Sequence, residues 1–342
     1  MSAQLGKHAS SHAGVLQNFR RQLFQSVPPI PPAISLVGKT VLVTGSNVGL
    51  GLECARHFLK LRASRLIMGV RSVQKGEAAK ASLRDEFPGV RIDVWLLDME
   101  SFASVKAFAA KCEKEIDRLH VAILNAGLAK DKFERVKEGR EHEVTIQVNY
   151  LSTALLATLL IPNMKPTSSS PGPGRLSIVS SNASLGVKLV DPGETGLLDS
   201  LDRPDKFGGF PQYCISKNLI TAFGARLAEN VDPNEVIVNT VNPGATHGTA
   251  FIRDVSWIVK AVMGLVFGIL GRTAVDASRI YVHACLVLGK ESHGSYTDWL
   301  IRPWPVMIYK DRSIYDKLWN ETMKEFLDVG VNVDGLLNEA KQ

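Results

Sequence analysis

The amino-acid sequence predicts a single α/β domain built on a doubly wound parallel sheet of about seven strands, with helices on both faces. Two observations predict this fold. Short runs rich in β-branched residues and leucine alternate with segments that are long enough for helices. These runs are apolar nearly throughout, which is typical of strands that are covered on both faces. With 342 residues, of which 45% are hydrophobic, the chain can bury a large core.

The predicted elements follow one another in a simple order. Residues 1–35 form an N-terminal arm, with a short helix near 15–23 and a proline-rich end. Residues 36–310 form the main domain, and the β-rich runs lie at 40–43, 65–70, 91–97, 120–124, 175–180 and 236–241. Residues 311–342 form a helical extension packed on the domain, because its apolar residues are spaced for one helix face, namely Ile314, Leu318, Met323, Phe326 and Leu327.

Charge and cysteine content exclude several classes of protein. The net charge of +6 is spread among 34 acidic residues, which argues against nucleic-acid binding and fits an anionic cofactor site. The four cysteines show neither metal-ligand spacing nor the density of a disulfide scaffold, so we expect no metal and a reducing, intracellular setting. They are Cys54, Cys112, Cys214 and Cys285.

The chain shows no obvious targeting or membrane-spanning segment. No apolar run reaches the roughly 18 to 20 residues that span a bilayer, and the N-terminus lacks the apolar core of a secretory signal. We therefore expect a cytoplasmic protein, with peripheral membrane association as an alternative. The first 52 residues contain no acid, so a mitochondrial presequence is compatible as well, but we favour an arm that packs on the domain.

A glycine-rich segment follows the first predicted strand. It runs directly into a helical pattern and carries glycines at positions 45, 49 and 51. Glycines placed there permit a tight turn and let backbone N–H groups approach a pyrophosphate. We expect the cofactor to contact Gly45, Ser46, Asn47, Val48, Gly49, Leu50 and Gly51.

A tyrosine and a lysine stand four residues apart in a helix-compatible stretch, as Tyr213 and Lys217. This spacing places both side chains on one helix face. A free tyrosine is a poor acid or base at neutral pH, and lowering its pKa by about 3 units requires roughly 4 kcal/mol of preference for the phenolate. A neighbouring lysine and the positive nicotinamide of an oxidised cofactor would supply that field.

These motifs resemble the short-chain dehydrogenase/reductase superfamily, whose members have the Rossmann fold. The resemblance rests on the glycine segment, on Asn125-Ala126-Gly127 after the fourth strand and on the Tyr213/Lys217 pair, and it covers roughly residues 36 to 300. It implies that Asp98, at the end of the third strand, contacts the adenine ring. It also implies that the segment after the sixth strand closes on the nicotinamide through Pro243, Gly244 and Thr246.

The resemblance also implies a catalytic tetrad. Its members are Asn149, Ser181, Tyr213 and Lys217, with Ser180 as the alternative serine. In reduction, Ser181 and Tyr213 would hold the carbonyl, hydride would pass to carbon, and Tyr213 would protonate the developing alkoxide. Lys217 would orient the ribose of the cofactor and the tyrosine, and Asn149 would bind a water molecule that links the lysine to solvent.

Cofactor choice follows from the charge at the end of the second strand. Enzymes of this superfamily that use NAD carry an acid there, which binds the ribose hydroxyls. This chain has Arg71 instead, and a guanidinium can hold a 2′-phosphate through charge-assisted hydrogen bonds. We therefore expect NADP(H), with Lys75 as a second candidate for the phosphate and a solvated surface arginine as the alternative interpretation of Arg71.

Within the superfamily the chain resembles the retinol dehydrogenase and WW-domain oxidoreductase branch, particularly its fungal members from secondary metabolism. The likeness lies in 19–24, 71–77, 272–274 and 291–296. It implies a ketoreductase or dehydrogenase for a small lipophilic substrate, and homo-oligomers are common in the superfamily. The substrate pocket should lie between 182–212 and the stretch after Thr246. An apolar segment at 257–270, inside a lid at about 246–275, could be the lid, a membrane contact or an oligomer surface.

A second class of function stays open. It is a redox-silent protein of the same fold, either an isomerase or cyclase with a structural cofactor or an NADP(H)-sensing binding protein. The presence of the whole tetrad argues against a pure sensor, which has no need of a proton relay.

Overall fold

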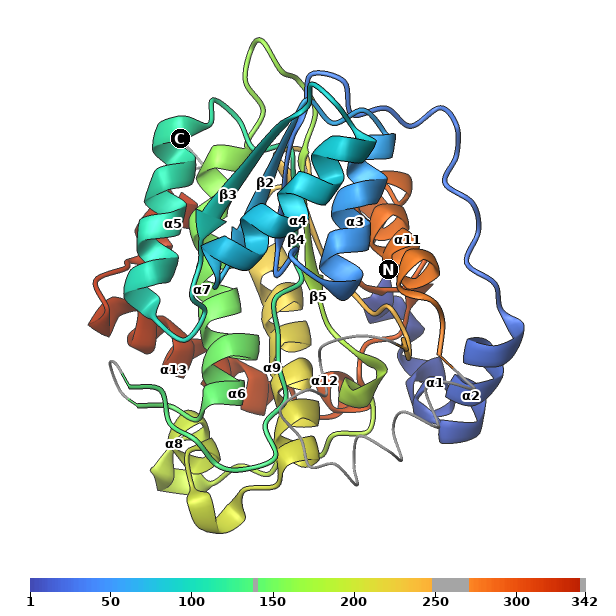
Figure 1. The fold of residues 1–342 in the computed structure, drawn as a ribbon. Helices are drawn as coiled ribbons and strands as arrows, with labels where there is room; N and C mark the ends of the chain where they lie inside the picture. Colours follow the sequence, from blue (N-terminus) through green and yellow to red (C-terminus); the bar gives the residue numbers. More distant parts are fainter. Residues whose placement is uncertain (138–140, 248–270, 339–342) are drawn as a thin grey trace.

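The computed structural model describes residues 1–137, 141–247 and 271–338, and it contains the predicted doubly wound sheet (Figure 1). The strand order is β3-β2-β1-β4-β5-β6-β7-β8, and all neighbours are parallel except the last pair. The strands are β1 (Thr40–Thr44), β2 (Arg65–Val70), β3 (Arg91–Leu96), β4 (Val121–Leu124), β5 (Gly174–Val179), β6 (Val236–Val241), β7 (Tyr296–Thr297) and β8 (Ile301–Arg302). The fold class is confirmed, and the short antiparallel β8 is the one strand in these ranges that breaks the parallel pattern.

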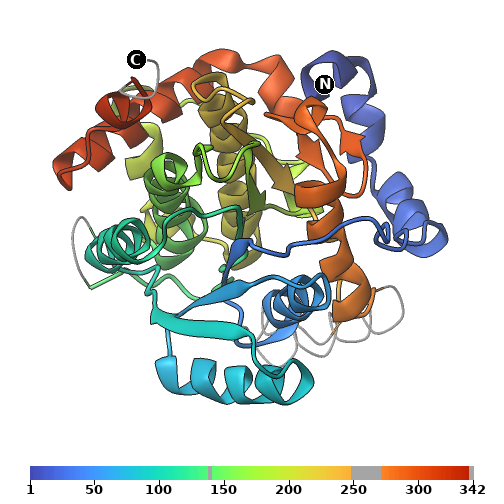
Figure 2. The same cartoon turned by 90° about the horizontal axis from the view of Figure 1, so that it is seen from above.

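Helices cover both faces of the sheet and give it two separate cores (Figure 2). On one face Phe58, Leu83 and Tyr281 belong to a single buried cluster, supplied by α3 (Gly49–Lys60), α4 (Val73–Glu86) and α11 (Ala274–Val282). On the other face the buried cluster is built from α5 (Phe102–Glu115), α7 (Thr153–Met164) and α9 (Gly209–Glu229). Burial on both faces explains why the strand sequences are apolar nearly throughout.

The strand order reverses between β1 and β4, which are neighbours in the sheet. In doubly wound sheets the crevice at the carboxyl ends of the strands beside such a reversal is where ligands bind. The predicted glycine segment follows β1 and the predicted Asn-Ala-Gly motif follows β4, so both lie at this edge.

One helical run of the described chain is long and apolar enough to cross a membrane by length and composition. It comprises Val144–Met164, and 94% of its apolar window is buried inside the fold. The run joins α6 (Val144–Ile146), the π-helical η2 (Gln147–Ser152) and α7. It is the core helix of the domain. The sequence shows no unbroken apolar run of this length because polar residues interrupt the pattern at Gln147 and Asn149.

The N-terminal arm folds against the C-terminal part of the domain. It contains η1 (Ser2–His8), α1 (Ala9–Ala13) and α2 (Val15–Phe24), and the backbone N–H of Tyr296 in β7 donates to Ser2 Oγ at 3.0 Å. The chain then runs back along the domain, where Val27 and Leu36 are buried beside α3 and α11.

The C-terminal extension packs helix α13 (Arg312–Asp328) on the core through Ile314, Leu318 and Phe326. Leu327 is 61% exposed, so its predicted place on the packing face was wrong. The remaining described elements are η3 (Asn182–Ser184), η4 (Gly193–Thr195), α8 (Leu197–Leu201), η5 (Pro204–Lys206), η7 (His283–Val287), η8 (Lys290–Ser292), α12 (Val306–Lys310) and α14 (Val333–Asn338).

Candidate active site

The glycine loop between β1 and α3 requires its glycines. Gly45 and Gly49 have φ angles of +65° and +59°, in the left-handed region that side chains avoid. A Cβ on Gly51 would lie 2.5 Å from the carbonyl oxygen of Gly45, so the helix can approach the loop only without a side chain there. The loop leads directly into the N-terminus of α3, where unpaired backbone N–H groups attract anions.

Residues after β4 hold this loop in place. The side-chain amide of Asn125 donates to the carbonyl of Thr44 at 2.9 Å, and the N–H of Ala126 donates to Thr44 Oγ1 at 2.9 Å. The hydroxyl of Tyr281, in α11, donates to Asn125 Oδ1 at 3.1 Å. Asn125 therefore shapes the loop, and Tyr281 fixes the orientation of Asn125. Sequence reasoning missed Tyr281, because no local motif marks it.

A buried, unsatisfied hydroxyl supports a phosphate-bearing ligand in this loop. Ser46 is fully buried, and its Oγ has no hydrogen-bond partner among the described residues. A buried polar atom without a partner is costly, so such an atom commonly marks the place of a ligand or water. Together with the left-handed glycines and the start of α3, this feature fits the pyrophosphate of a dinucleotide.

The end of β2 carries Arg71, which is 53% exposed in its side chain and pairs with Glu100 at 2.5 Å. Glu100 is placed there by a turn, in which its N–H donates to Asp98 Oδ1 at 3.0 Å. Lys75 lies exposed in the first turn of α4, where its N–H is capped by Ser72 Oγ. Sequence reasoning placed Arg71, Lys75 and Asp98 at this corner but missed the carboxylate of Glu100.

The structure brings the predicted serine and tyrosine together. Tyr213, in α9, hydrogen-bonds through its hydroxyl to the side chain of Ser181, which follows β5. The neighbouring Ser180 points its hydroxyl elsewhere, to Thr221 Oγ1 at 2.6 Å and to the carbonyl of Lys217 at 3.1 Å. The geometry therefore favours Ser181 over Ser180 as the serine of the site.

Lys217 lies beneath this pair in a buried position. Its Nζ is 5.9 Å from the centroid of the Tyr213 ring and donates to the carbonyl of Val179 at 2.9 Å. Burial lowers the pKa of Lys217 to about 8. A Cβ on Gly127 would lie 3.3 Å from this Nζ, so the glycine of the Asn-Ala-Gly motif leaves room beside the lysine.

Asn149 lies within the π-helical turn η2, a rare helix form that is frequent at functional sites. Its side-chain amide donates to Ser216 Oγ at 3.0 Å and to the carbonyl of Leu128 at 2.8 Å. Its Oδ1 accepts the N–H of Leu128 at 2.9 Å. Asn149 thus ties α9 to the segment after Gly127.

In the polypeptide alone, burial sets the direction of the pKa shift of Tyr213, and the predicted effect of the oxidised nicotinamide stays a prediction. Burial raises the pKa of Tyr213 well above its ordinary value, and the hydrogen bond from Ser181 opposes this effect only in part. The Nζ of Lys217 is 5.9 Å from the ring centroid, and burial disfavours the charge of the lysine itself. The phenol therefore keeps its proton, as an acid must before it donates.

The segment after β6 is fixed by two asparagines. Asn242 Oδ1 accepts the N–H of Gly244 at 3.1 Å and the N–H of Asn182 at 3.0 Å. Gly244 has a φ of +77°, so the turn depends on it. Thr246 is buried, and its hydroxyl donates to the carbonyl of Gly244 at 3.3 Å. The segment also contacts Gln22 of the N-terminal arm, which sequence reasoning did not include in the site.

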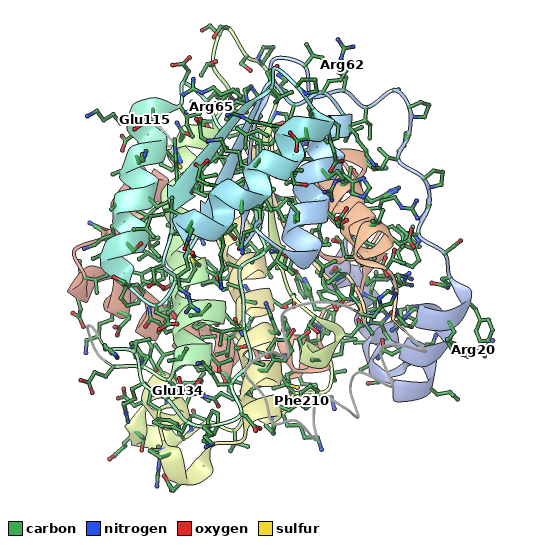
Figure 3. All side chains as sticks on the ribbon, in the orientation of Figure 1. Arg20, Arg62, Arg65, Glu115, Glu134 and Phe210 are labelled. Atoms are coloured by element: carbon green, nitrogen blue, oxygen red, sulfur yellow. The ribbon has the colours of Figure 1, made fainter. Side chains whose placement is uncertain are left out.

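One residue of the segment that is predicted to line the substrate pocket lies beside Tyr213. Phe210, at the start of α9, is labelled in Figure 3. It is 59% exposed and stacks on Tyr213 with 6.4 Å between ring centroids. An apolar ring therefore lies directly beside the phenol. The apolar segment at 257–270 lies outside the described residues, and so does most of the predicted lid at 246–275.

The fold and this site define an oxidoreductase of the Rossmann class, and comparison with known proteins gives the family. The family model for short chain dehydrogenases matches residues 39–189. The chain is 42% identical over 352 aligned residues to the short chain dehydrogenase virL of Hypocrea virens, with 100% of both chains covered. It is 41% identical to the short chain dehydrogenase opdN of Penicillium oxalicum, covering 86% of this chain and 97% of that one. The protein belongs to the short-chain dehydrogenase/reductase family.

Solved structures show the same fold. An L-sorbose reductase from Gluconobacter frateurii, complexed with NADPH and L-sorbose, has a TM-score of 0.58 at 20% identity, covering 78% of this chain and 97% of that one. A short chain dehydrogenase from Salmonella enterica has a TM-score of 0.58 at 20% identity, covering 79% of this chain and 99% of that one. These structures confirm the fold, the relatives named above confirm the family, and the finer likeness to retinol dehydrogenases stays a prediction.

Proposed function

We propose that this oxidoreductase uses NADP(H) to interconvert a carbonyl and an alcohol on a small lipophilic substrate. The observation that carries the proposal is the hydrogen-bonded pair of Ser181 and Tyr213, with Lys217 buried beneath it, next to a glycine loop that fits a pyrophosphate. An acid, a hydrogen-bond partner and a cation in one place are what proton transfer to a carbonyl oxygen requires.

In reduction, NADPH held by the glycine loop and Arg71 would supply the hydride for the carbonyl carbon. The hydroxyls of Ser181 and Tyr213 bind the carbonyl oxygen, and Tyr213 donates its proton to that oxygen as negative charge develops there. Burial keeps this proton on the phenol at neutral pH. Lys217 provides the nearby positive charge that favours the phenolate left behind. Oxidation reverses each step.

The preference for NADP(H) rests on Arg71 and Lys75, which stand exposed at the end of β2 and the start of α4. A 2′-phosphate placed there would accept charge-assisted hydrogen bonds from the guanidinium. The Gluconobacter reductase of the same fold was solved in complex with NADPH, which is consistent with this choice.

A lipophilic substrate is supported by Phe210, whose exposed ring stacks on the reactive phenol. A solvent-exposed aromatic ring beside a catalytic group provides apolar area that a lipophilic substrate would cover. A role in secondary metabolism is the biological setting that we propose for such a substrate.

The test is the consumption of NADPH and, separately, of NADH against a panel of lipophilic aldehydes and ketones. We expect turnover with a preference for NADPH, which Arg71→Ala lowers by about tenfold in the ratio of kcat/KM values because one charge-assisted contact is lost. Arg62→Ala is the matched control, since Arg62 lies exposed at the opposite edge of the sheet (Figure 3). If NADPH binds but no carbonyl is consumed, the proposal fails in favour of a redox-silent function.

A further inference from the structure

A small polar cavity lies where the N-terminal arm meets the C-terminal part of the domain. Its lining includes Arg21 from α2, Tyr296 from β7 and Arg302 from β8, together with His12, Arg272 and Asp298. It also reaches Asn182, the residue after Ser181. The site described above assigns no role to this cavity.

The charges that line this cavity do not balance. Three guanidinium groups, of Arg21, Arg272 and Arg302, face it, and Asp298 is the one carboxylate among the described lining residues. That carboxylate forms an ion pair with Arg302, whose Nε donates to it at 2.7 Å. Arg272 bonds instead to neutral acceptors, Gln22 Oε1 at 2.9 Å and the carbonyl of Gln25 at 3.0 Å. The cavity therefore carries an excess of positive charge, and such an excess favours an anion.

His12 adds a hydrogen-bond donor that has no acceptor. Arg21 Nη1 lies 2.7 Å from His12 Nδ1, and a guanidinium can only donate, so Nδ1 accepts and the ring proton is on Nε2. The residue is 6% exposed, and Nε2 has no hydrogen-bond partner among the described residues. Burial, aided by Arg21 and Arg302, lowers the pKa of His12 to about 3, so the ring stays neutral.

A buried N–H without an acceptor costs free energy, which an anionic acceptor would recover. The cavity is small, with room for a group about the size of a water molecule. We propose that this cavity binds one anionic atom, either a chloride ion or one oxygen of a small carboxylate whose other atoms lie at the open side of the cavity, through the guanidinium groups and the Nε2–H of His12. The anion would hold the arm against β7 and β8, and its binding does not depend on the reaction proposed above.

The experiment measures thermal unfolding of the full chain at constant ionic strength. Sodium gluconate, whose anion is too bulky for the cavity, is replaced stepwise by sodium chloride or by sodium formate. We expect a saturable rise in Tm of about 2 °C or more with at least one of the two small anions. Protection by formate alone assigns the site to carboxylates, protection by chloride alone assigns it to chloride, and protection by both assigns it to small monovalent anions in general. The linewidth of the chloride NMR signal measures chloride binding directly, without any variant.

Two lining variants and one control separate this site from general salt effects. Arg302→Gln removes one guanidinium, and His12→Asn keeps an acceptor for Arg21 while it removes the Nε2–H. Both variants should lose the protection. Arg20→Gln, an exposed arginine that points outward from α2, should keep it (Figure 3).

Equal Tm values in gluconate, chloride and formate, together with an unbroadened chloride signal, would overturn the proposal. Protection of Arg302→Gln equal to that of Arg20→Gln would overturn it as well. If a lining variant does not fold, the wild-type Tm series and the chloride linewidth still test whether the cavity binds an anion.

Discussion

The side chain of Gln22 forms two hydrogen bonds with the backbone of Ala245. Its Nε2 donates to the carbonyl at 2.8 Å, and the N–H of Ala245 donates to its Oε1 at 3.2 Å. A Cβ on Gly244 would lie 2.5 Å from the same Oε1, so the contact is close. A residue of the N-terminal arm, which lies outside the matched family model, thus fixes the segment that is predicted to close on the nicotinamide.

Removing this contact should weaken cofactor binding. Gln22→Ala deletes its two hydrogen bonds to Ala245 and the one that its Oε1 accepts from Arg272. We expect about half of the roughly 3 kcal/mol involved to oppose cofactor binding, which raises the KM for NADPH by about tenfold. Gln17→Ala is the matched control, because Gln17 lies exposed on the same helix. Equal KM values for the two variants would show that the arm does not position the segment.

The carboxylate of Glu100 should compete with a 2′-phosphate for Arg71, since the two side chains form an ion pair at 2.5 Å. Glu100→Gln removes that competitor, and because the pair is partly exposed we expect only a two- to fivefold tighter Kd for NADPH, from about 0.5 to 1 kcal/mol. The Kd for NADH should not change. Fluorescence titration measures both constants, with Glu113→Gln on α5 as an exposed control. Weaker NADPH binding would argue that Glu100 orients Arg71 instead.

The pH dependence of carbonyl reduction should reflect the titration of Lys217. Burial lowers its pKa to about 8, so its positive charge is present below that pH and lost above it. Because kcat/KM reports groups of the free enzyme, we expect kcat/KM for the carbonyl to be flat near neutrality and to fall above about pH 8. The pKa of Tyr213 is raised, so its proton is not the first to be lost. A profile that rises through pH 8 would contradict this assignment.

His142 links three parts of the fold away from the site. Burial alone would lower its pKa, but the carboxylates of Asp202, at 2.6 Å, and Glu325, at 3.2 Å, outweigh burial and raise the pKa to about 9. A raised histidine pKa stabilises the fold fully below about 6.5, and the stabilisation is lost as the pH rises through about 9.

Replacing this histidine should therefore destabilise the protein in a pH-dependent way. His142→Gln leaves Glu325, which is 1% exposed, without its buried cation, and we expect a loss of about 3 kcal/mol in the free energy of unfolding near pH 6. Denaturant titrations of wild type and variant at about pH 6 and pH 9.5 measure the difference. If the difference is as large at the higher pH, the charge of His142 is not its cause.

Much of the fold and the centre of the site could be predicted because their signals are local. The strands at 65–70 and 236–241 have the predicted bounds, and Tyr213 and Lys217 share a helix as their spacing indicates. Gly45 and Gly49 adopt positive φ angles in the predicted loop.

What could not be predicted depends on contacts between distant segments. Gln22 hydrogen-bonds to Ala245, which lies 223 residues away in the sequence, and Tyr281 hydrogen-bonds to Asn125, which lies 156 residues away. No spacing rule connects such pairs. The raised pKa of Tyr213 in the polypeptide alone comes from burial, which only the packed structure reveals.

The most direct test of the account is the transfer of hydride from deuterium-labelled NADPH to one accepted lipophilic carbonyl, measured for Tyr213→Phe and for Tyr309→Phe. Both changes remove one phenol hydroxyl, but Tyr309 lies in α12 and bonds the backbone of Trp304. We predict that Tyr213→Phe binds NADPH normally and loses about 100-fold or more in the rate of labelled product, as expected when a general acid is removed. Tyr309→Phe should keep the wild-type rate. If Tyr213→Phe reduces the carbonyl as fast as Tyr309→Phe does, Tyr213 is not the acid and the proposed reaction centre is wrong.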